Sequence, residues 1–193
     1  MTKDLFDGIK QWEFETKGMK GKLPVFYYDN TSVTAIYTAS TAQVKALLPH
    51  PDMRPIELYR HTCLTVFTAF EYRKSDIGPY NEFSIAFPIT FRKRQIPGIT
   101  VIRQMARRCF TAYVWQLPVT TEIARAGGME MYGLPKFIAD ISFKKEQGWI
   151  ECGQFSDGRR RHVVSVNGPV AVNLFDKGLQ PGFLGITPVV LLK

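Results

Sequence analysis

The chain has 193 residues, of which 45% are hydrophobic and 22% charged, a composition typical of one globular domain and not of a disordered chain. No run approaches the roughly 20 apolar residues of a membrane span, and residues 1–18 lack the apolar stretch of a signal peptide. Lysine and arginine outnumber aspartate and glutamate by 25 to 17, which is compatible with solvated surface charge, attraction of small anions or nucleic-acid binding.

Residues 1–22 show no clear periodicity, so we expect a loosely organised N-terminal arm. Beyond them β-branched and aromatic residues fill short segments that are separated by Gly, Pro, Asn or Asp, a pattern typical of strands. The predicted strands are residues 33–37, 64–72, 83–91, 109–116, 137–143, 149–155, 162–166, 170–174 and 186–192.

The segment 83–91 has the clearest pattern. Large apolar side chains occupy its odd positions and small ones most of its even positions, which predicts a strand with one bulky face. Pro88 has no backbone N–H to donate, so we expect a sheet edge or a bulge there.

Two helices are predicted. Residues 40–48 begin with the capping residues Ser40 and Thr41 and end before Pro49. Residues 120–126 begin with Thr-Thr-Glu and end at a Gly-Gly pair that suits a C-terminal cap. We therefore expect a single domain over residues 1–193, a β-rich α+β fold with a closed or conical sheet and helices outside it.

The cysteines and histidines are few and scattered. None of the three cysteines forms a CxxC pair, so we expect neither a disulfide framework nor a zinc site, and a reducing compartment such as the cytoplasm. The three histidines lack the spacing of metal ligands, and we expect no metal and no cofactor. These residues are Cys63, Cys109, Cys152, His50, His61 and His162.

The main candidate for chemistry is Lys136, which follows a Gly-Leu-Pro turn and opens an apolar strand. A lysine among apolar groups loses hydration, which disfavours its charged form and leaves a neutral amine that can attack a carbonyl to form an imine. The alternative is an ordinary lysine whose ammonium reaches water at a strand end. Its apolar neighbours in the sequence are Met129, Met131, Tyr132, Leu134, Phe137 and Ile138.

Two carboxylates could assist this lysine. Glu82 follows a turn at the start of the 83–91 strand, where it could orient a substrate or shuttle protons near an imine. Glu130 stands near the end of the second predicted helix. The structural alternatives are a solvent-facing Glu82 and a Glu130 that binds backbone or an arginine.

These segments together resemble the acetoacetate decarboxylase superfamily. The family couples a Tyr-x-Glu turn before an apolar strand with a later Gly-x-Glu helix end and a Gly-x-Pro-Lys turn. Order and spacing agree over about residues 25–143, in the segments Ala35-Ile36-Tyr37, Leu47-Leu48-Pro49, Tyr80-Asn81-Glu82, Gly128-Met129-Glu130 and Gly133-Leu134-Pro135-Lys136.

The resemblance implies a conical β-barrel with flanking small sheets and a few helices. It implies that Lys136 forms a Schiff base and that Glu82 is the second catalytic residue. Acetoacetate decarboxylase is itself an example of an enzyme whose lysine is activated by its environment. The substrate-binding residues that we infer beside them are Glu130, Tyr80, Tyr132 and Met131.

The sequence departs from the family pattern in three places. Pro135 and Phe137 flank Lys136 where the decarboxylase has a second lysine, so activation would depend on desolvation. Asn30 stands where a pocket arginine is expected, which argues against acetoacetate as substrate unless a cation comes from elsewhere. The chain is also several dozen residues shorter, so we expect abbreviated last strands or a sheet completed by another chain. The candidates for the missing cation are Arg103, Arg107 and Arg108.

Three functions are compatible with the sequence. The first is a Schiff-base-forming lyase that decarboxylates, cleaves or dehydrates a small oxo-acid or related carbonyl compound through Lys136. The second is a non-catalytic small-molecule-binding protein of the same fold, which the missing arginine favours. The third, nucleic-acid binding, depends on charge alone, and residues 159–161 have only Phe155 nearby for stacking. We expect the first, in a homo-oligomer with a small-molecule partner and with neither nucleic acid nor membrane.

Overall fold

The computed structural model describes the backbone of residues 6, 8–16, 18–107, 109–146, 149–156, 161–169 and 189–190, and side chains as far as residue 144. These residues form a mostly β-rich α+β fold with few helices, as the sequence predicts. The elements in chain order are β1 (Trp12–Thr16), β2 (Met19–Leu23), β3 (Tyr27–Ser40), α1 (Thr41–Leu47), β4 (Met53–Pro55), β5 (Glu57–Tyr59), β6 (Thr62–Ser75), β7 (Tyr80–Phe91), α2 (Ile99–Ala106), β8 (Ala112–Val119), α3 (Glu122–Tyr132), β9 (Lys136–Ile138), β10 (Asp140–Glu146), β11 (Trp149–Ser156), β12 (Arg161–Pro169) and β13 (Val189–Val190).

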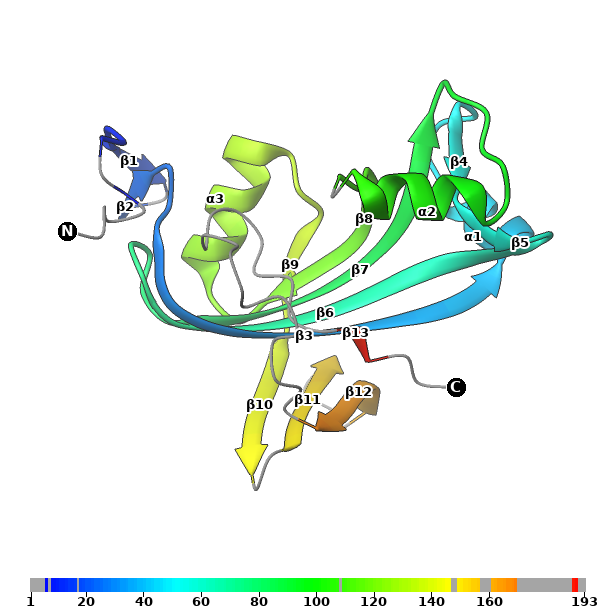
Figure 1. Ribbon diagram of the computed structural model, residues 1–193. Coiled ribbons are helices and arrows are strands. Elements are labelled where there is room, and N and C mark those ends of the chain that lie inside the picture. Colours follow the sequence, from blue (N-terminus) through cyan, green and yellow to red (C-terminus); the bar gives the residue numbers. More distant parts are fainter. Residues whose placement is uncertain are drawn as a thin grey trace.

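One large curved sheet organises these elements, and its strand order is β13-β3-β6-β7-β8-β9. Its neighbours pair antiparallel except β13–β3 and β8–β9, which are parallel. In the part of the chain that the structure describes this path does not close on itself, so the expected conical barrel is not seen. Helices α2 and α3 lie on one side of the sheet, and the small sheet of β10, β11 and β12 lies on the other (Figure 1).

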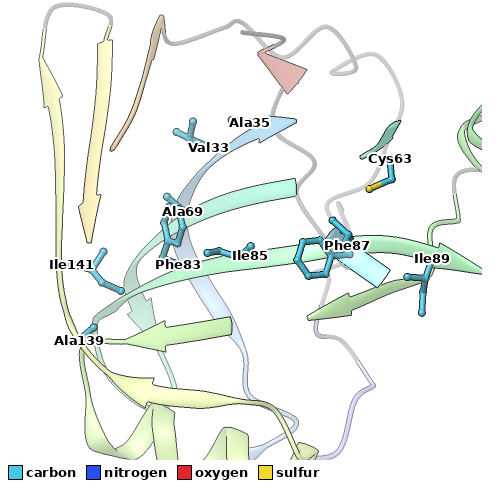
Figure 2. Close-up of a cluster of buried hydrophobic side chains, with 11 residues drawn as sticks. Val33, Ala35, Cys63, Ala69, Phe83, Ile85, Phe87, Ile89, Ala139 and Ile141 are labelled. Atoms are coloured by element: carbon cyan, nitrogen blue, oxygen red, sulfur yellow. The ribbon is translucent and has the colours of Figure 1, made fainter. Parts of the chain in front are cut away.

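The main core lies on the bulky face of β7, as the alternation of residues 83–91 predicts. Figure 2 shows these side chains along the strand, packed near Ala139 and Ile141 at the start of the small sheet. Pro88 does not lie on an edge strand, but the β6 ladder ends two residues earlier at Ala86, and a register shift lies between Ile85 and Ala86. The buried residues that β7 contributes are Phe83, Ile85, Phe87 and Ile89.

The helices differ from the predictions in two ways. The predicted C-cap at Gly127 and Gly128 is wrong, because α3 continues to Tyr132 and ends at Gly133, which adopts the left-handed conformation with φ 62°. Helix α2 is not predicted, because its β-branched residues favour a strand. In the structure its buried Val101 packs with Ile56 and Leu64 in a second small core. Helix α1 is confirmed.

The N-terminal arm predicted over residues 1–22 is more ordered than expected, because β1 and β2 pair as an antiparallel hairpin. The predicted strand 137–143 is divided at Ala139, whose N–H donates to the Val119 carbonyl 3.0 Å away. The other predicted strands as far as residue 166 are confirmed with shifted ends, whereas 170–174 and most of 186–192 lie outside the described residues. None of the helices described is long and apolar enough to cross a membrane.

Candidate active site

Lys136 is carried by β9, at the edge of the described sheet. The turn before it is fixed by the end of α3, because the Leu134 N–H donates to the Gly128 carbonyl at 3.1 Å. Strand β9 then pairs in parallel with β8, with Lys136 opposite Leu117. The helix end and the strand ladder together determine where the lysine enters the fold.

The Lys136 side chain forms an ion pair with Glu82 on the helix side of the sheet. Its Nζ lies 2.7 Å from the Glu82 Oε2, and the two side chains are only 7% and 10% exposed. Glu82 lies on β7 opposite Val119 of β8, two residues along β8 from the partner of Lys136. The strand order β7-β8-β9 therefore places the two residues on either side of one strand. The sequence placed both residues in one expected site but did not predict their direct contact.

Lys136 and Glu82 are the two halves of one buried ion pair. An ammonium and a carboxylate that are removed from water compensate each other only when they are paired and hydrogen-bonded, as they are here. Glu82 is also the group placed to accept a proton from the amine. A proton transfer from Nζ to the carboxylate would remove both buried charges at once.

Three tyrosines surround this pair, and only one of them was expected. The Lys136 Nζ lies 5.7 Å from the centre of the Tyr80 ring, and the Tyr80 hydroxyl hydrogen-bonds to that of Tyr27 at 3.1 Å. The Tyr72 ring lies 4.4 Å from Tyr27 and 4.7 Å from Tyr80, measured between ring centres. Tyr72 pairs directly with Tyr80 across β6 and β7. Only the register of that hairpin could have identified it from the sequence.

These tyrosines are neutral at ordinary pH. Burial raises the pKa of Tyr27 to about 12, opposed by the hydrogen bond with Tyr80 and helped by the negative charge of Glu82. Burial, followed by the charge of Glu82, raises the pKa values of Tyr72 and Tyr80 well above the usual range. The pair is therefore flanked by uncharged rings and hydroxyls.

The structure does not bring the other predicted site residues to Lys136. Glu130 is exposed on α3, and its carboxylate accepts a hydrogen bond from Thr16 of β1 at 2.5 Å, so it joins the helix to the N-terminal hairpin. Met131 is 41% exposed and Tyr132 58% exposed. The apolar residues of α3 that were expected beside the lysine therefore point largely to solvent, and Tyr80, from a distant part of the chain, lies beside it instead.

No arginine contacts Lys136 or Glu82 among the side chains that the structure describes. Asn30 is exposed on β3. Arg73, on the adjacent strand β6, is occupied by Asp29, Glu71 and Thr31. Arg103 belongs to α2, which lies towards the other end of the sheet from α3 (Figure 1).

The sequence predicts neither a metal site nor a disulfide. Among the described residues there is no group of three or more His, Cys, Asp or Glu side chains that could hold a metal ion. Cys63 is buried and Cys109 exposed, and both are unpaired with another cysteine. Cys152 and Arg108 lie outside the described side chains.

Comparison with known proteins gives one family and one fold. The sequence profile of the acetoacetate decarboxylase family matches residues 14–177. The solved structures of similar fold include an acetoacetate decarboxylase with a TM-score of 0.57 and 16% identity, covering 75% of this chain and 50% of that one. Another is the acetoacetate decarboxylase from Legionella pneumophila, with a TM-score of 0.52 and 18% identity, covering 68% and 44%.

A further similar structure is the enduracididine biosynthesis enzyme MppR, solved with the condensation product of pyruvate and imidazole 4-carboxaldehyde. Its TM-score is 0.54 at 16% identity, over 84% of this chain and 60% of that one. The chain thus spans about half the length of the solved proteins that it matches. No curated protein sequence matches it significantly.

Proposed function

The chain belongs to the acetoacetate decarboxylase family, and from this premise we propose that it is a Schiff-base-forming lyase acting on a small oxo-acid or related carbonyl compound through Lys136. The observation that supports this most is the position of the Lys136 amine, buried and 2.7 Å from the Glu82 carboxylate. An imine-forming lysine needs a nearby group to take its proton and an environment that excludes competing water.

The reaction begins when the Lys136 ammonium gives a proton to Glu82. The neutral Nζ attacks the substrate carbonyl carbon, and the carbinolamine loses water to form a protonated imine. If the substrate is a β-oxo-acid, the bond to its carboxyl group breaks, carbon dioxide leaves, and the electron pair passes to the imine nitrogen to give an enamine. Protonation of the enamine carbon and hydrolysis of the new imine release the product and restore Lys136.

Glu82 would act at each proton transfer of this sequence. It receives the proton of Nζ, can return one to the departing hydroxyl of the carbinolamine, and can stabilise the positive charge of the protonated imine that replaces the ammonium. The Tyr80 ring, 5.7 Å from Nζ, adds a second favourable contact with that positive charge. The same residues could support aldol-type cleavage or dehydration, because one imine serves all three reactions.

The ion pair also favours a second candidate, a carbonyl-binding protein without turnover. A lysine held as an ammonium by Glu82 does not attack a carbonyl, and no arginine within the described part of the site offers to bind a substrate carboxylate. In this case Lys136 would donate hydrogen bonds to a ligand oxygen without forming a bond to carbon.

Borohydride reduction separates the two candidates. The protein is incubated with pyruvate, acetoacetate or acetone, reduced, and analysed by intact and peptide mass spectrometry. We expect a reduced adduct at Lys136, and a Lys45→Arg variant, altered at an exposed lysine of α1, should form it equally well. Binding without any adduct would instead support the carbonyl-binding protein, and strongly salt-dependent oligonucleotide binding would support a nucleic-acid function.

A further inference from the structure

Two adjacent glycines lie inside helix α3, although glycine is less favourable than alanine in a helix interior. They have different surroundings. A Cβ atom on Gly127 would lie 3.6 Å from the nearest ring atom of Phe14, an ordinary contact. A Cβ atom on Gly128 would lie 2.4 Å from Cδ and 2.6 Å from Cε of Lys136, far inside any acceptable contact.

The stem of Lys136 therefore occupies the space that a side chain at position 128 would need. Gly128 is buried, and the lysine runs across its Cα on the way to Glu82. The four-carbon stem is flexible, but its middle is held on one side by the helix while its end is held by the carboxylate. Without the close approach at Gly128, the ammonium could not follow this path.

We infer that Gly128 is a positioning residue, which lets the Lys136 side chain lie against α3 and so directs its amine to Glu82. That this position affects imine formation by Lys136 rests on the proposed function. The steric contact between position 128 and the Lys136 side chain does not rest on it. Gly128 does not touch the reacting atoms and acts only through Lys136. An alanine at this position would force the lysine stem away from the helix, because a side chain moves at less cost than the helix backbone.

The backbone role of Gly128 is a separate matter. Its carbonyl accepts the hydrogen bond from Leu134 that closes the end of α3, and an alanine would keep that carbonyl in place. The helix end does not require a glycine here, since the left-handed position belongs to Gly133. The three atoms nearest to a Cβ at position 128 all belong to the Lys136 side chain, so the contact that would exclude a side chain here is with Lys136.

The test compares Gly128→Ala with Gly127→Ala, which makes the same exchange one residue earlier in the same helix. Acetylation with limiting acetic anhydride, which needs no imine, reports how accessible each lysine is, and peptide mass spectrometry resolves Lys136 from the exposed Lys45. We expect labelling of Lys136, relative to Lys45, to rise severalfold in Gly128→Ala and to stay at the wild-type level in Gly127→Ala. The rate of the borohydride-trapped pyruvate adduct should fall about a hundredfold in Gly128→Ala only, because a displaced reactive group loses rate steeply.

A thermal-melt cycle tests the steric clash without any chemistry. In a Lys136→Ala background, Gly128→Ala should raise the melting temperature by about 2–4 °C, as a helix-favouring exchange in a protein of this size does. In the wild-type background, Gly128→Ala should not raise the melting temperature. Gly127→Ala should raise it by about 2–4 °C in both the wild-type and the Lys136→Ala backgrounds. Equal shifts for Gly128→Ala in the two backgrounds would overturn the inference.

The failures of the two proposals are distinguishable. Wild-type protein that traps no carbonyl compound would refute the proposed function, while the labelling and the thermal cycle would still decide the role of Gly128. Wild-type labelling and wild-type trapping in Gly128→Ala would refute the positioning role and leave the proposed function standing.

Discussion

The hydroxyl oxygens of Tyr27 and Tyr80 lie 3.1 Å apart, so one hydroxyl donates a hydrogen bond and the other accepts it. The two residues come from β3 and β7, and β6 lies between those strands in the sheet. The negative charge of Glu82 acts on both phenols and opposes their ionisation. With Tyr72 of β6, three neighbouring strands thus contribute uncharged phenols to one cluster beside Lys136 and Glu82.

The tyrosine cluster predicts a loss of stability at alkaline pH. Because the pKa of Tyr27 is raised to about 12, the unfolded chain releases its phenolic proton near pH 10 while the folded protein keeps it. The contribution of Tyr27 is fully present below pH 10 and is lost between pH 10 and about 12, by roughly 2–3 kcal/mol. Urea unfolding across this range should be less pH-dependent in Tyr27→Phe, whereas Tyr59→Phe, at an exposed site, should behave as wild type.

Removal of the Glu82 charge should destabilise the fold. Glu82→Gln leaves the Lys136 ammonium buried without a counterion, and loss of one partner of a buried pair costs about 3–5 kcal/mol, less here because the amide oxygen still accepts a hydrogen bond. Urea unfolding measures this loss. The double variant Glu82→Gln with Lys136→Met should regain at least half of it. Glu71→Gln, in the exposed pair with Arg73, should change stability by no more than about 1 kcal/mol.

Lys136→Arg should preserve the fold and abolish adduct formation. The guanidinium keeps a positive charge beside Glu82 but cannot form an imine with a carbonyl carbon. Circular dichroism checks the fold, and borohydride trapping with pyruvate checks the chemistry. A reduced adduct in this variant at a rate near that of wild type would show that another lysine carries the reaction.

Asp76 should contribute to stability at neutral pH and lose this contribution in acid. Burial raises the pKa of Asp76, but hydrogen bonds from Phe26, Tyr28 and Gln11 outweigh it and hold the pKa below the usual value. The carboxylate contribution is therefore present above the ordinary pKa and disappears as the pH falls through the lowered one. In Asp76→Asn the free energy of unfolding, measured by circular dichroism, should fall less steeply as the pH is lowered. Asp52→Asn, which alters an exposed pair with Arg92, should show the wild-type dependence.

The sequence was sufficient for the strands whose pattern is local. Strand β7 was predicted because its apolar residues alternate with period two, and the structure buries four of the five large ones in one core, whereas Phe91 at the strand end is 42% exposed. Lys136 and Glu82 were identifiable as unusual because each stands beside a turn at the start of an apolar strand. Their contact was not, because they are 54 positions apart and the order of β7, β8 and β9 is needed to relate them.

The remaining errors arise where tertiary contacts override local preference. Helix α2 contains β-branched residues, and only the burial of Val101 against other strands reveals its helical face. Gly127 and Gly128 suggested a helix end, because no sequence pattern shows that a lysine eight residues later needs the space. The sequence also suggested that the apolar residues next to Lys136 would line the site. The structure places Tyr27 and Tyr72 near it instead, and these residues are far from Lys136 along the chain.

The parallel pairing of β8 with β9 affects how the site responds to warming and to denaturant. Glu82 and Lys136 are each hydrogen-bonded into the ladder next to β8, so fluctuation of a surface loop cannot draw one away from the other. The two residues stay aligned as long as β7, β8 and β9 remain hydrogen-bonded to one another. Moderate warming or mild denaturant should thus leave the amine in place until the sheet opens as a whole, so that chemical competence and cooperative folding are lost in a single step.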